Sequence, residues 1–128
     1  MAGDPIEGQV LVLTAAKASV PPKRLPTLVD QVQTLLGPAL ERYRREYERV
    51  HAEDELEAFL VEWGHWDELA ADLDLSERER SAVRRAHEEQ LLRIGRRTGR
   101  ESAFETALEI REPVCIGTDG DRDDRTEN

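Results

Sequence analysis

The chain has 128 residues, a mass of 14.6 kDa and a formal net charge of −10. Its longest run without a charged residue, residues 31–40, is about half the roughly 20 apolar residues of a membrane helix, so the composition predicts no membrane span. The single cysteine, Cys115, excludes an internal disulfide. A secretory signal has basic residues before its apolar segment, and none precedes the apolar residues 10–13. We therefore expect a cytoplasmic protein.

Charge and hydropathy predict one domain between two polar ends. Residues 1–8 contain acids and no base, and residues 117–128 contain five acids against two arginines. Low hydrophobicity combined with like charge favours disorder. The sequence therefore predicts a flexible N-terminus at 1–8, a single domain at 9–116 and a disordered acidic tail at 117–128.

The first element of the domain is ambiguous. The apolar run Val-Leu-Val-Leu at 10–13 is typical of a buried strand, and we interpret residues 10–14 as one. The alanines at 15, 16 and 18 are helix formers, however, and a run this short has no periodicity that decides between strand and helix.

A long amphipathic helix is predicted over residues 28–51. Its apolar residues recur at steps of three and four, which places them on one face: Leu28, Val32, Leu35, Leu36, Ala39, Leu40, Tyr43, Tyr47 and Val50. Gly37-Pro38 interrupts this pattern, and a proline inside a helix removes a backbone hydrogen bond. We therefore predict one kinked helix, or two helices nearly in line.

A second long helix is predicted over residues 77–98. Ser76 and Glu79 form a capping box, in which each side chain bonds the backbone amide of the other residue. Gly99 is suited to end the helix, because glycine adopts the left-handed conformation found after many helices.

Two further strands complete the prediction. Residues 58–62 alternate before the break at Gly64, and residues 107–116 mix alternation with β-branched side chains. Pro113 lacks an amide donor, which places the second half of that strand at a sheet edge. The fold class predicted is α+β: the long kinked amphipathic helix and the second long helix pack on a small sheet of two or three strands.

The end of the first long helix is the candidate interaction surface. Tyr43, Tyr47 and Val50 continue the apolar stripe for more than two turns beyond Pro38. A small domain leaves part of such a face uncovered, and exposed apolar stripes mark partner surfaces. We therefore predict a dimer, or contact with another protein, through this stripe, unless the last strand or residues 63–66 cover it within one chain.

A cluster of arginines is a candidate anion-binding site. Arg93, Arg96, Arg97 and Arg100 fall within eight residues with no acid between them. Such a cluster is suited to phosphates, but cations are also favoured at a helix C-terminus. An acidic domain repels nucleic acid, so this partner is disfavoured.

The Gly64 turn is a candidate pocket because it brings Trp63, His65 and Trp66 close together. The alternative is that the tryptophans anchor this corner to the core.

The sequence predicts no metal, no cofactor and no catalytic residue. His51, His65, His87 and Cys115 lack ligand spacing, and His51 and His87 are expected on helices, facing solvent. No nucleophile-histidine-acid arrangement or phosphate-binding glycine loop is present, so the balance is against an enzyme.

Five segments resemble a small family of uncharacterised proteins from halophilic archaea. They are, in order, Arg24-Leu25-Pro26, Gly37-Pro38, Gly64-His65-Trp66, Arg84-Arg85-Ala86-His87-Glu88, and residues 104–112. The resemblance covers about residues 9–117 and implies a salt-adapted cytosol, with which the scarcity of lysine agrees, but it implies no activity. We expect a non-enzymatic protein-interaction domain that self-associates; the alternative is a nucleic-acid-associated regulator that uses the arginine cluster.

Overall fold

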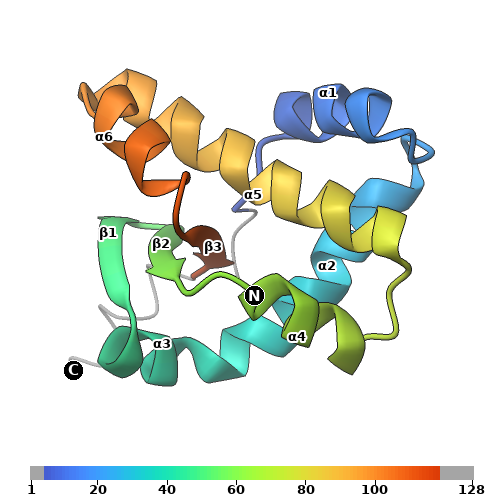
Figure 1. The fold of residues 1–128 in the computed structure, drawn as a ribbon, viewed down its shortest axis with the longest axis horizontal. Helices are drawn as coiled ribbons and strands as arrows, with labels where there is room; N and C mark the ends of the chain where they lie inside the picture. Colours follow the sequence, from blue (N-terminus) through green and yellow to red (C-terminus); the bar gives the residue numbers. More distant parts are fainter. Residues whose placement is uncertain (1–4, 119–128) are drawn as a thin grey trace.

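The computed structural model describes residues 5–118, which form an α+β fold (Figure 1). The elements in chain order are α1 (Gly8–Ala18), α2 (Arg24–Leu36), the 3₁₀ turn η1 (Gly37–Ala39), α3 (Leu40–Glu46), β1 (Glu48–Glu53), β2 (Leu56–Val61), α4 (His65–Asp72), α5 (Glu77–Thr98), α6 (Glu101–Ala107) and β3 (Glu112–Gly117). The predicted fold class is confirmed.

The three strands form one antiparallel sheet in the order β1-β2-β3. β1 and β2 are a hairpin joined by Asp54 and Glu55, and the register shifts at Val50, between Arg49 and His51, where β1 bulges. Every residue of β2 and β3 is buried. β3 lies at an edge, as predicted from Pro113.

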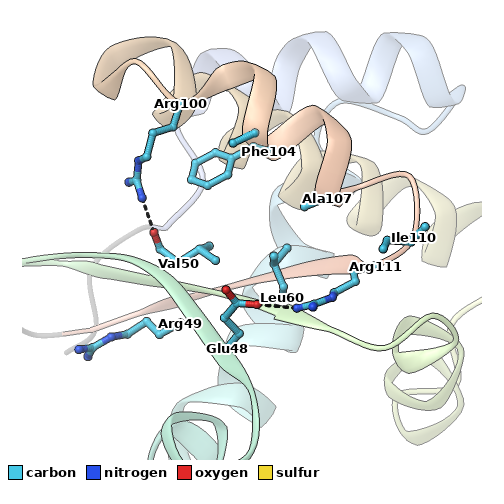
Figure 2. A pocket seen from close by; sticks show the side chains of 10 residues that line it. Glu48, Arg49, Val50, Leu60, Arg100, Phe104, Ala107, Ile110 and Arg111 are labelled. Carbon is cyan, nitrogen blue, oxygen red and sulfur yellow. Dashed lines mark hydrogen bonds and ion pairs between the residues drawn. The ribbon is translucent and has the colours of Figure 1, made fainter.

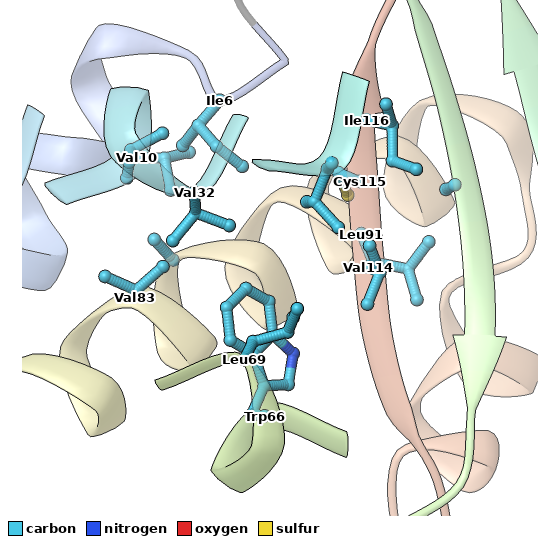
Figure 3. Close-up of a cluster of buried hydrophobic side chains, with 14 of the residues drawn as sticks. Ile6, Val10, Val32, Trp66, Leu69, Val83, Leu91, Val114, Cys115 and Ile116 are labelled. Atoms are coloured by element: carbon cyan, nitrogen blue, oxygen red, sulfur yellow. The ribbon is translucent and has the colours of Figure 1, made fainter. Parts of the chain in front are cut away.

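The helix α5 crosses the molecule and packs against α1, α6 and β3 (Figure 1). At the outer edge of β3, the Cys115 amide donates to His87 Nδ1 on α5, at 2.9 Å. On one face of the sheet, the rings of Tyr43 on α3 and Phe59 on β2 lie 5.8 Å apart. The core between α5, α2 and β3 contains Trp66, whose indole donates to the carbonyl of Pro113 (Figure 3).

The boundaries predicted for the second long helix are those of α5. The capping box is present, with the Glu79 amide 3.1 Å from Ser76 Oγ and the Ser76 amide 3.1 Å from Glu79 Oε1. Gly99 ends the helix with φ of +75°. These signals act within a few residues, so the sequence alone contains them.

The strand predicted at residues 10–14 is wrong, because this segment belongs to helix α1. Val10, Thr14 and Ala15 face inward, a spacing that fits a helix, whereas Val12 and Leu13 are 63% and 53% exposed. The helix packs on α5, where only one side of the apolar run is buried.

The first long helix ends earlier than predicted. The kink at Gly37-Pro38 is confirmed as η1, but α3 ends at Glu46, and residues 48–53 form β1. His51 therefore lies on a strand. The sequence does not predict β1 because its side chains are mostly polar. Glu57 of β2 is buried between Arg44 of α3 and Arg49 of β1, so ion pairs take the place of an apolar contact here.

The last predicted strand begins too early. Residues 101–107 form α6 and β3 begins at Glu112, so only the second half of the segment is a strand. After Gly99 the chain reverses and α6 packs against α5, with Phe104 of α6 against Gly95.

The packed part of the chain extends beyond the predicted 9–116 at both ends. Ile6 is 3% exposed, and Glu7 pairs with Arg93 and Arg97. The amide and the hydroxyl of Thr118 donate to carbonyls of the β1–β2 turn. Most of the predicted tail, residues 119–128, lies outside the described residues, as do residues 1–4. Within the described part, no helix is both long and apolar enough to cross a membrane.

Candidate functional site

An open groove between α6 and the strands β1 and β2 is the candidate binding site (Figure 2). Its volume is about 500 Å³, within the range of small ligand pockets. Ten residues line it: Glu48, Arg49, Val50, Leu60, Arg100, Ala103, Phe104, Ala107, Ile110 and Arg111. Its apolar residues come from all three elements, and its charged residues are three arginines and one glutamate.

The groove exists because α6 presents small side chains to the sheet. Ala103 and Ala107 are one helical turn apart and both line the groove, and Ala107 looks toward Leu60 in Figure 2. Phe104, the larger residue of this face, is 4% exposed and packs against Gly95 of α5. Since the helix is held by α5, the two alanines do not fill the space above Leu60.

Two polar contacts hold α6 and its flanking residues to β1 (Figure 2). Arg100 Nη1 donates to the Val50 carbonyl at 2.7 Å, and Arg111 Nη1 donates to Glu48 Oε1 at 2.6 Å. The second contact is an exposed ion pair, with side chains 42% and 57% accessible. Exposed pairs contribute about 0–1 kcal/mol, so this contact is readily exchanged for another.

His51 and Glu53 orient Arg100. The Arg100 guanidinium donates to His51 Nδ1 at 2.8 Å, so the ring carries its proton on Nε2, which donates to Glu53 at 2.8 Å. The guanidinium also lies over the Phe104 ring, 4.8 Å from its centre. Arg100 is therefore fixed between the groove floor and β1.

The predicted arginine cluster is engaged within the chain. Arg93 pairs with Glu7 at 2.9 Å, and Arg97 pairs with the same carboxylate at 3.3 Å. Arg96 pairs with Glu101 at 2.9 Å. A hydrogen bond from Gln90, together with the charges of Arg93 and Arg97, lowers the pKa of Glu7. The cluster therefore fastens the start of α1 and of α6 to α5, and only Arg100 lines the groove.

The predicted interaction stripe is largely covered within the chain, so its expected exposure is wrong. Tyr43 is fully buried, and Tyr47 and Val50 are half-buried. The cover comes from the 63–66 corner, since the Tyr43 hydroxyl bonds His65 Nε2 and both tyrosine rings pack on the imidazole. Burial raises the pKa of Tyr43 to about 12 and lowers the pKa of His65. Val50 alone joins the groove.

The three residues of the candidate pocket have different environments. Trp66 is fully buried, with its indole bonded to Pro113 and its amide bonded by the Glu112 carboxylate. Trp63 is 61% exposed and lies under Arg84, and His65 faces Tyr43. The three residues are neighbours in the sequence, but their side chains do not line one cavity.

His87 is buried, contrary to the solvent-facing position expected for it. Its Nδ1 accepts from the Cys115 amide, and its ring lies 4.7 Å from that of Trp66. Burial lowers the pKa of His87 to about 3, so it is neutral at physiological pH. Burial also raises the pKa of the Cys115 thiol to about 12. Among residues 5–118, no group of three or more His, Cys, Asp or Glu side chains is placed to hold a metal ion.

Most groove residues are absent from the candidate site residues named in the sequence analysis; Val50 and Arg100 are the two named there, in different candidate sites. The signal is present on α6, where positions 103, 104 and 107 share one face of the helix. It was missed because part of this segment was interpreted as a strand.

Comparison with known proteins identifies the family. A family model described as a domain of unknown function (DUF8048) matches residues 4–118. The chain belongs to this family. No curated protein and no solved structure matches it. The matched range agrees with the packed region, and the groove lies wholly inside it.

Proposed function

We propose that the protein is a non-enzymatic interaction domain that binds a partner protein in the groove between α6 and β1. The observation that carries the proposal is an apolar floor with Arg100 and Arg111 at its rim, on a chain whose net charge is −10. The floor is suited to one aliphatic or aromatic side chain. The rim is suited to a carboxylate beside it.

The rim favours an acidic partner because its arginines have donors to spare. Arg100 uses its guanidinium on a backbone carbonyl and a neutral ring, so its positive charge is not neutralised by those contacts. Arg111 is engaged only by the exposed Glu48 among the described residues. A carboxylate that enters the groove therefore meets the uncompensated charge of Arg100, while the apolar floor excludes a purely polar ligand.

A nucleic-acid-associated regulator has less support. Such a role requires arginines free to meet phosphates, whereas Arg93, Arg96 and Arg97 are paired with carboxylates of their own chain. Titration with duplex DNA at varied salt tests this role, and binding whose logarithm falls linearly with the logarithm of salt concentration would favour it.

The proposal is tested by selecting displayed random short peptides on the purified domain. Enriched peptides are expected to place Ile, Leu, Val or Phe next to Asp or Glu. Their affinity, measured by fluorescence anisotropy, is expected to fall at least about tenfold in Ala103→Trp, which fills the groove from the exposed face of α6.

The matched control is Ser102→Trp, an exposed position on the same helix that does not line the groove. It is expected to bind the enriched peptides as the natural chain does. A selection that enriches no acidic-apolar pair overturns the proposal, as do peptides that bind Ala103→Trp unchanged.

A further inference from the structure

The rim of the groove carries an apolar side chain that the chain itself does not cover. Ile110 follows α6 and is 71% exposed, the highest value among the exposed large apolar residues of the described part. Glu109 precedes it, is exposed, and makes no ion pair within residues 5–118. The pair Glu109-Ile110 is therefore an aliphatic side chain beside an unengaged carboxylate, which is the ligand chemistry proposed for the groove.

We propose that the occupant of the groove is a second copy of this chain, whose Ile110 enters the groove while its own groove receives Ile110 in return. This inference rests on the proposed function and names its partner. A two-fold dimer requires that the two complementary features lie in one patch, because the same surface of each copy forms the contact. Ile110 is a lining residue of the groove, so both features meet this requirement.

The charges of the patch also suit a copy of itself. Arg49 is paired with Glu57, so with Glu109 included the patch has Arg100 and Arg111 against Glu48 and Glu109 and is neutral, whereas the whole chain carries −10. Two acidic molecules therefore meet less repulsion through this face than their net charges alone would give. Glu109 of the partner subunit meets the guanidinium of Arg100 or Arg111, and the exposed Glu48–Arg111 pair can exchange across the two-fold axis at little cost.

The groove replaces the stripe of Tyr43, Tyr47 and Val50 as the candidate dimer surface, because the stripe is largely covered within the chain. Tyr43 is buried against His65, so the tyrosines offer little apolar area to a partner. Val50, the remaining member, lies on the groove floor. A dimer through the groove would bury Val50 and Ile110 together.

The test is the mass in solution by light scattering and sedimentation equilibrium, over about 5 to 500 µM chain and at low and high KCl. The natural chain is expected to approach twice its 14.6 kDa mass with rising concentration. Ile110→Asp is expected to weaken association at least about tenfold, since it places a carboxylate on the apolar floor. Because Ile110 is exposed, this variant is expected to keep the circular dichroism spectrum and the unfolding midpoint of the natural chain.

The matched control is Val12→Asp, which changes an equally exposed apolar residue on α1, outside the groove. It is expected to dimerise as the natural chain does, whereas Ala103→Trp, which fills the groove, is expected to stay monomeric. A monomeric mass throughout the range overturns the inference, as does a dimer that Ile110→Asp leaves intact. A monomer that still selects acidic-apolar peptides refutes the second copy alone, and a monomer that selects none refutes the proposed function as well.

Discussion

Burial of His87 makes the stability of the domain depend on pH below about 6.5, and a variant that lacks only this ring separates its contribution from that of the carboxyl groups. The ordinary pKa of histidine is 6.5, and burial lowers that of His87 to about 3. Below pH 6.5 the unfolded chain takes up a proton that the folded chain excludes. Stability is therefore full above pH 6.5 and falls as the pH is lowered toward 3. At two pH units below 6.5, the loss from this one ring is about 3 kcal/mol.

The measurement is urea unfolding of the natural chain and of His87→Asn between about pH 7.5 and 4.5. Asparagine keeps an oxygen that can accept from the Cys115 amide, but it does not titrate. We expect the variant to be less stable by about 1–3 kcal/mol at pH 7.5, because ring packing against Trp66 is lost. Between pH 7.5 and 4.5, its free energy of unfolding is expected to fall by about 3 kcal/mol less than that of the natural chain. The contribution of His65 is common to both curves and cancels, so parallel curves would refute the reasoning.

Three further predictions concern packing and charge. Gly95→Ala is expected to destabilise the domain by about 1–3 kcal/mol, because the added Cβ would lie 2.9 Å from the Glu101 Cα and from the Phe104 ring. Gly37→Ala has open space around its Cβ and is expected to stabilise the domain by about 0.4–1 kcal/mol. Equal effects of the two variants in urea unfolding would contradict this account. Leu36→Ala is expected to cost about 2–5 kcal/mol because Leu36 is 1% exposed, and a loss below about 0.5 kcal/mol would remove this face from the core. If the acidic composition is an adaptation to salt, the thermal midpoint should rise between about 0.1 and 2 M KCl as the screening length shrinks, and calorimetry showing a flat or falling midpoint would reject it.

The elements that the sequence predicts correctly are those with local signals. The capping box at Ser76 and the left-handed Gly99 define α5 without reference to any other part of the chain. The elements that it misses are defined by their neighbours. β1 is polar because it is an edge strand with an ion pair to Glu57, and its two-residue turn, Asp54-Glu55, lacks the glycine that marks many hairpins.

The candidate site is harder to predict from sequence than the fold, because it depends on contacts between residues that are far apart in the sequence. His65 was expected at a pocket and instead covers Tyr43, which removes one predicted site and part of another. The arginines are close together in the sequence, but Glu7, the partner of Arg93 and Arg97, is more than 80 residues away from them. The groove forms because Ala103 and Ala107 are small and because α6 lies above the sheet, and the placement of α6 depends on the tertiary structure.

The construction of β1 also determines how a partner can bind. An exposed edge strand usually invites another strand to pair with it. Here the bulge at Val50 breaks the regular backbone pattern of the edge strand, and the Val50 carbonyl already accepts from Arg100. Backbone pairing is therefore blocked at the centre of β1, while the sheet face beside it, over Leu60, stays open beneath α6. A partner consequently gains more by inserting a side chain into the groove than by extending the sheet, which is the mode that Ile110 and its neighbouring carboxylate provide.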